Sequence, residues 1–75
     1  MKTSELGRVL KEMYKSAPEG EAVTMIHLFG IKYAEIIISS EFTAREIVTE
    51  AGLNDSYATE VRKGIKISRY VKLKS

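Results

Sequence analysis

Residues 43–63 read TAREIVTEAGLNDSYATEVRK, and this stretch decides the fold. It opens with a capping box, in which the Thr43 hydroxyl accepts from the Glu46 backbone N–H while the Glu46 carboxylate reaches back to the Thr43 backbone. A helix is therefore expected to begin at Thr43. Gly52 offers the left-handed conformation that ends many helices, and Leu53 is placed to pack back on the turn. The stretch thus predicts a short helix with a sharp end.

A second helix is predicted directly after this turn. Asn54, Asp55 and Ser56 are residue types that cap helix N-termini well. Apolar side chains then recur at helical spacing, at Tyr57, Ala58, Val61 and Ile65. We therefore expect helices over about residues 43–51 and 55–70, joined by a tight turn.

This order of helix, turn and helix resembles the helix-turn-helix superfamily of DNA-binding modules. In that family spaced apolar positions flank the turn glycine, and in this chain they are Ile47, Ala51, Leu53, Ala58 and Val61. The chain departs from the family at Val48, where a small residue usually lets the two helices approach closely. The resemblance implies an all-α bundle of about four helices, whose last helix enters the major groove of double-stranded DNA.

The resemblance also implies which side chains would touch DNA. Thr43 and Arg45 would hold phosphates. The side chains that would face base edges are Ser56, Thr59, Glu60 and Lys63. Among these, Glu60 would accept from a cytosine amino group and Lys63 would approach guanine. An attraction that does not depend on base sequence, and that falls as salt rises, would come from Arg62, Lys66 and Arg69.

The charge of the chain is unevenly distributed. Residues 61–75 carry six Lys or Arg and no acid, residues 41–60 carry one base and five acids, and residues 1–40 are balanced. A basic cluster attracts polyanions, most commonly nucleic acid, although a solubilising tail has the same composition. Four acids around the motif would repel phosphate unless they point away, and they are Glu41, Glu46, Glu50 and Asp55. The alternative function is therefore a protein-interaction module or accessory subunit.

Two further helices are predicted before this motif. Over about residues 4–16, apolar residues follow the spacing of one helix face: Leu6, Val9, Leu10, Met13 and Tyr14. Pro18 cannot continue this helix. The next helix, over about residues 21–38, is apolar around an unusually wide arc. Gly30 within it lowers helix stability by about 1 kcal/mol relative to Ala, which predicts close helix packing at that point.

Leu28, Ile31 and Ile38 lie off the main apolar face of that helix, where a small monomer would be expected to place charge. This strip predicts a homodimer interface, unless another helix of the same chain covers it. Two segments also have strand alternatives. Residues 36–38 are three β-branched isoleucines, which favour a short strand. Residues 65–73 alternate between apolar and polar, so that an edge strand competes with a helical continuation.

The composition limits the remaining function classes. At 75 residues the chain is expected to be one domain, residues 1–75, with modest burial and no cysteine to cross-link it. His27 is the only histidine, so neither a metal site nor a cofactor is predicted. The glycines stand singly and no nucleophile has a partner base, so catalysis is not expected.

The same composition bears on where the protein acts. Without a signal-like N-terminus the protein is expected in the cytoplasm. The most apolar segment, residues 22–38, contains His27, Lys32 and Glu35, and therefore predicts a core helix rather than a membrane span. The sequence as a whole predicts a small dimeric DNA-binding protein with a role in transcription regulation.

Overall fold

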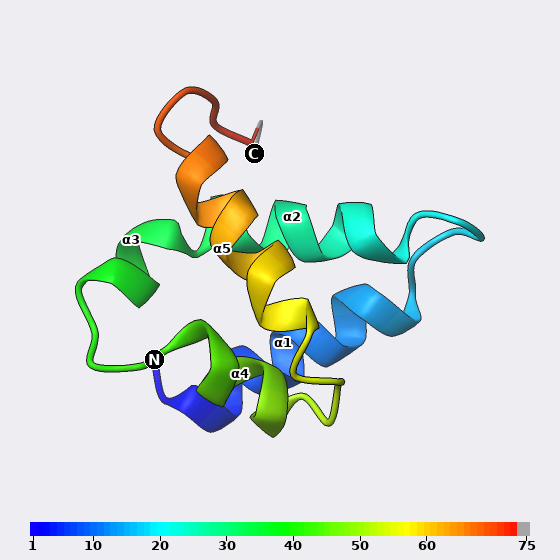
Figure 1. Cartoon of the computed structure of the whole chain (residues 1–75), viewed down its shortest axis with the longest axis horizontal. Coiled ribbons are helices and arrows are strands. Elements are labelled where there is room, and N and C mark those ends of the chain that lie inside the picture. The colour runs from blue at the N-terminus through cyan, green and yellow to red at the C-terminus, as the bar shows by residue number, and fades with distance from the viewer. Residues whose placement is uncertain (74–75) are drawn as a thin grey trace.

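The computed structural model describes residues 1–73, which form five helices and no strand (Figure 1). The helices are α1 (Thr3–Lys15), α2 (Ala22–Lys32), α3 (Ala34–Ile38), α4 (Ala44–Glu50) and α5 (Tyr57–Ile67). The predicted all-α class is confirmed. Lys74, part of the basic end, lies outside the described residues. Within the described chain no helix has the length and apolar character needed to span a bilayer.

The helices surround one core to which all five contribute. Helix α5 crosses α2, while α1 lies against both α4 and α2, and α4 packs on α5 (Figure 1). The side chains that are completely buried come from four of the helices: Leu6, Leu10, Ile26, Phe29, Ile47, Val48 and Val61. Ile37 adds a contribution from α3, with 5% of its surface exposed. This arrangement holds the α4–turn–α5 unit on a platform formed by α1 and α2.

Helix α1 has the apolar face that its sequence predicts. Leu6 and Leu10 are fully buried, and Val9, Met13 and Tyr14 pack partly against the core. The Tyr14 hydroxyl lies 3.2 Å from that of Tyr57, which joins α1 to the start of α5. Helix α1 is therefore fixed to both halves of the helix-turn-helix unit.

The prediction of one continuous helix over residues 21–38 is wrong. Tyr33 has φ −106° and ψ 13°, outside the helical region, and separates α2 from α3. The Tyr33 ring packs on Phe29, four residues earlier in the chain, with ring centroids 5.1 Å apart. After the break, Ala34 and Ile37 of α3 are buried in the core. The helix ends at Ser39, whose hydroxyl donates to the Glu35 carbonyl oxygen at 2.8 Å.

Both strand alternatives are wrong, because residues 36–38 are helical and α5 continues as far as Ile67. The chain then leaves the helix three residues before the predicted end at residue 70. The Ser68 hydroxyl bonds to the Ile65 carbonyl oxygen, and residues 68–70 form a turn.

Candidate nucleic-acid interface

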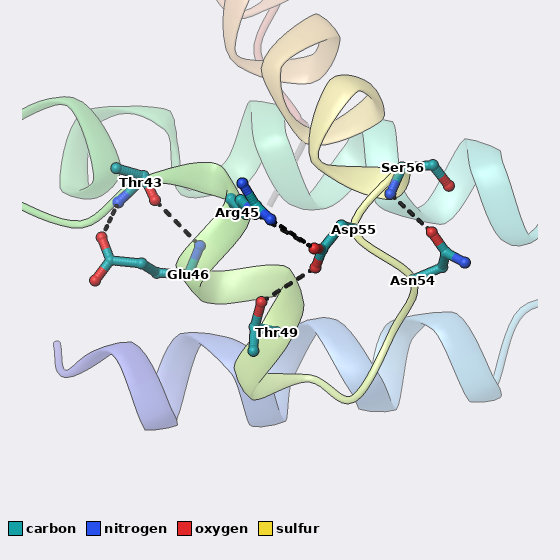
Figure 2. A network of polar contacts seen from close by, with 7 residues as sticks. All are labelled: Thr43, Arg45, Glu46, Thr49, Asn54, Asp55 and Ser56. Atoms are coloured by element: carbon teal, nitrogen blue, oxygen red, sulfur yellow. Dashed lines mark hydrogen bonds and ion pairs between the residues drawn. The ribbon is translucent and has the colours of Figure 1, made fainter.

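The start of α4 is a complete capping box, as its sequence predicts. The Thr43 hydroxyl accepts from the Glu46 backbone N–H at 3.1 Å, and the Glu46 carboxylate accepts from the Thr43 backbone N–H at 2.9 Å (Figure 2). These two bonds satisfy donors that the first turn of a helix leaves free. They also hold the Glu46 carboxylate against the backbone.

The turn after α4 closes as a Schellman motif. Gly52 has φ 75°, its N–H donates to the Thr49 carbonyl oxygen at 3.0 Å, and the Leu53 N–H donates to the Val48 carbonyl oxygen at 3.1 Å. Leu53 packs partly against the core, as expected. Val48, the departure from the superfamily pattern, is fully buried, and α4 and α5 are in contact all the same.

A second set of polar contacts joins α4 to the residues before α5. The Arg45 guanidinium donates to Asp55 Oδ2 from Nη2 at 3.1 Å and from Nε at 3.3 Å, and the Thr49 hydroxyl donates to Asp55 Oδ1 at 3.3 Å (Figure 2). The side chains of Arg45 and Asp55 are 71% and 54% exposed, so this ion pair contributes about 0–1 kcal/mol. The predicted phosphate ligand Arg45 is thus paired, but in a contact that solvent reaches.

Helix α5 begins from an Asx turn. The Asn54 side-chain oxygen accepts from the Ser56 backbone N–H at 3.0 Å (Figure 2). Ser56 is the N-cap residue, yet its side chain makes no capping hydrogen bond and is exposed. Of the three predicted capping residues, Asn54 is therefore the one whose side chain orders the helix start.

Four of the predicted DNA-contacting residues gather on one face of α5, which we call the basic face: Thr59, Arg62, Lys63 and Lys66. All four are exposed, and at about 100° per residue they span an arc of about 100°. The opposite side of α5 is buried through Ala58, Val61 and Gly64. Arg69 follows in the turn after the helix and is also exposed. The structure thus places three cations side by side, and one of them, Lys63, lies 3.4 Å from the Glu60 carboxylate at the edge of this face.

Glu60 lies on α5 at the edge of the basic face, between Lys63 and helix α2. Its carboxylate Oε1 lies 2.7 Å from His27 Nε2 on α2, and Oε2 accepts from Lys63 Nζ at 3.4 Å. An ionised carboxylate only accepts, so Nε2 of His27 is the donor. This hydrogen bond, helped by Lys63, lowers the pKa of Glu60. Both oxygens that would read cytosine are therefore already bonded.

His27 is a residue of this region whose partner the sequence does not reveal. Glu60 is 33 residues away along the chain, and no local pattern links the two. Their side chains are only 30% and 22% exposed, so the pair forms a half-buried polar link between α2 and α5.

The crossing of α2 and α5 is built on two glycines. A Cβ atom on Gly30 would lie 2.5 Å from the Val61 carbonyl oxygen and 2.9 Å from the Gly64 Cα. A Cβ atom on Gly64 would meet the His27 carbonyl oxygen and would lie 2.9 Å from the Gly30 Cα. The predicted close packing at Gly30 is confirmed. Gly64 is likewise an isolated glycine within a predicted helix, residues 55–70, so the sequence held the same indication of close packing there, but it was not used.

The residues predicted to form a dimer interface differ in exposure. Leu28 and Ile31 are half-buried on α2, while Ile38 at the end of α3 is 68% exposed. They therefore do not form a uniformly exposed strip.

Comparison with known proteins gives one match. A family model described as an HTH-like domain matches residues 2–74. No curated protein and no solved structure matches the chain. The family match spans α1 to α5 and so includes the capping box, the glycine turn and the basic face. The predicted helix-turn-helix relationship is confirmed, and the chain belongs to the HTH-like domain family.

Proposed function

We propose that this protein binds double-stranded DNA with the basic face of α5 in the major groove. The observation that carries the proposal is the grouping of Arg62, Lys63 and Lys66 on the exposed side of the second helix of the unit. Helix α5 has 11 residues and is therefore about 16 Å long, enough to follow the groove over several base pairs. Membership of the HTH-like domain family supports the same function.

The acids of the unit do not oppose this proposal as strongly as their number suggests. The Glu46 carboxylate is bonded within the capping box, and Asp55 accepts from Arg45 and Thr49. Glu60 is turned toward His27 on α2. Asp55 is thus paired with a cation, Glu46 is held at the start of α4, and Glu60 is shared between His27 and Lys63, so that Arg62 and Lys66 are the cations of the basic face with no ion-pair partner within 4.0 Å among residues 1–73.

The proposed roles follow from position. Thr59 and Lys63 lie on the groove-facing side and would contact base edges, with Lys63 approaching guanine. Arg62, Lys66 and Arg69 would contact phosphates and supply attraction independent of base sequence. Thr43 would contact a phosphate from the start of α4, and Ser56 would face base edges from the start of α5. In this proposal the protein acts in the cytoplasm as a dimeric transcription regulator.

The test is a titration of fluorescently labelled duplex DNA over a range of salt concentrations. Each phosphate contact contributes about −0.9 to the slope of log K against log salt. We expect Arg62→Ala and Lys66→Ala each to reduce that slope by about 1 and to weaken binding to all sequences. Lys11→Ala removes an equally exposed cation from α1 and serves as the matched control, with little change expected.

The second candidate function, binding to a protein partner, is favoured by the exposed apolar residues of α3 and of the chain after α5. The same titration separates the two candidates. If the protein binds no duplex of any length at low salt, DNA binding is wrong and the protein-interaction function takes its place.

A further inference from the structure

Large apolar side chains are exposed mainly in two parts of the chain. Of the eight such residues in the described part of the protein, six belong to α3 or to the chain from residue 67 onward. They are Ile36, Ile38, Ile67, Tyr70, Val71 and Leu73. Tyr70 and Ile38 protrude most, with 81% and 68% of their surfaces exposed. Single exposed apolar residues are ordinary, but grouping on this scale is typical of a surface that another molecule covers.

These two parts of the chain meet at one groove. After α5 the chain turns back toward α2 (Figure 1), and the groove between them has a volume of about 500 Å³. Its apolar lining comes from Ile31 and Ile36 on one side and from Val71 and Leu73 on the other. Ile31, Ile36, Val71 and Leu73 therefore belong to one surface, which we call the apolar groove.

Charges of both signs line the same groove. The charged lining residues are Glu35 on α3, Lys32 at the end of α2 and Lys72 in the chain after α5. Among residues 1–73, none of these three side chains has an ion-pair partner within 4.0 Å. Such a surface offers a self-complementary contact, because a two-fold axis that sets Glu35 of one copy against Lys72 of the other forms the same ion pair twice.

We propose that the apolar groove is the surface on which two copies of this chain associate, with Lys72 of each copy facing the partner's Glu35. A stable pair hides about 800 Å² on each copy, roughly a sixth of the 5143 Å² surface of this chain. The contact therefore extends beyond the groove to Ile38 and Tyr70. A 75-residue domain without cysteine gains most of its available extra burial in this way.

Association would bring together two basic faces. Helix α5 leads directly into the turn at residues 68–70, so the paired surface and the proposed DNA-contacting surface belong to one continuous segment. Two α5 helices held in one assembly would contact two half-sites, which a single copy cannot do. This consequence rests on the proposed function, whereas the association itself does not.

Sedimentation equilibrium without DNA, from low micromolar to millimolar protein, tests the association. We expect the mass to rise from one chain to two. Val71→Asp should weaken the pair on the order of tenfold or more, as loss of a central interface contact does. Val23→Asp is the matched control, because Val23 is 42% exposed and Val71 46%, but Val23 lies outside the groove. Circular dichroism establishes that both variants are folded.

Charge reversal tests the orientation of the pair. Glu35→Lys and Lys72→Glu should each weaken self-association, because like charges then face each other across the two-fold axis. An equal mixture of the two variants should form heterodimers, in which both contacts are attractive again. A pairing of Glu35 with Lys72 within one chain would not be restored by mixing.

Three results would overturn the proposal: a mass of one chain at every concentration, equal effects of Val71→Asp and Val23→Asp, or no heterodimer in the mixture. Since DNA is absent from these measurements, each result stands independently of the duplex titration. A monomer that binds duplex DNA would leave the proposed DNA binding intact, and would remove the association and with it the dimeric form of the proposed regulator.

Discussion

Gly30 and Gly64 face each other where α2 and α5 cross, and the backbones of the two helices meet there without an intervening side chain. The contact sets how far α5 stands from the rest of the protein. It also explains two isolated glycines that would otherwise only lower the stability of their helices.

Gly30→Ala should destabilise the protein by about 1–3 kcal/mol, because overpacking at this crossing outweighs the gain of about 1 kcal/mol in helix propensity. The atoms in the way belong to the backbone of α5 and cannot move unless the helices separate. Urea unfolding followed by circular dichroism measures the effect. Thr24→Ala, at an exposed position of the same helix, should stay within about 0.5 kcal/mol of the wild type. Equal stabilities of the two variants would contradict the crossing.

Thr43→Ala should lower the free energy of unfolding by about 1 kcal/mol, since it removes the acceptor for the Glu46 backbone N–H. Thr43→Ser keeps that oxygen and should restore most of the loss. The comparison is made by thermal and urea unfolding. An alanine variant as stable as the serine variant would show that the capping bond contributes nothing.

Glu60 should make stability depend on pH in the acid range. Its pKa is lowered in the folded protein, chiefly by the hydrogen bond from His27, so its contribution is present above the unfolded value of about 4.3. That contribution is lost as the pH falls through the lower folded value. Glu60→Gln should therefore be less stable than the wild type at neutral pH, and the difference should shrink in acid.

Urea unfolding at a series of pH values checks this prediction. Glu12→Gln, an exposed change on α1, is the control and should show no such convergence with the wild type. A Glu60→Gln variant as stable as the wild type at neutral pH would mean that the link between α2 and α5 does not stabilise the fold.

Asp55→Asn should strengthen binding to duplex DNA severalfold at low salt. The change removes a negative charge beside the proposed interface and frees the Arg45 guanidinium for phosphate. The folded state should lose about 1 kcal/mol or less, because the pair is exposed. Fluorescence anisotropy with duplex DNA measures the affinity, and Glu19→Gln, in the loop after α1, provides a charge-matched control. Equal affinities for the two variants would place Asp55 outside the interface.

The parts of this fold that the sequence predicts correctly depend on neighbouring residues. The Thr43 and Glu46 capping box spans four residues, and the left-handed Gly52 is needed by the backbone locally, so both are visible without a structure. The break at Tyr33 accompanies the burial of Ala34 and Ile37 of α3 in the core, which depends on residues distant in the sequence. Helix periodicity alone continues through such a position.

In the candidate site, too, local features can be predicted from the sequence and distant contacts cannot. The face shared by Arg62, Lys63 and Lys66 follows from helix geometry and is therefore predictable. Glu60 was predicted to contact a base because its bond to His27 cannot be seen in the sequence. The two residues are 33 positions apart, and no local pattern connects them. A side chain can therefore be assigned to a base contact only when its partners elsewhere in the folded chain are known.

The basic face of α5 carries no residue of the core, since burial on this helix falls to Ala58, Val61 and Gly64. Thr59, Arg62 and Lys66 can therefore change without altering how the helix packs, whereas Lys63 also bonds to Glu60 of the link to α2. In this helix the residues that stabilise the fold differ from the residues that would set the proposed preference for a DNA sequence. Under the proposed function, randomising these positions would generate a library of folded proteins from which altered DNA preferences could be selected.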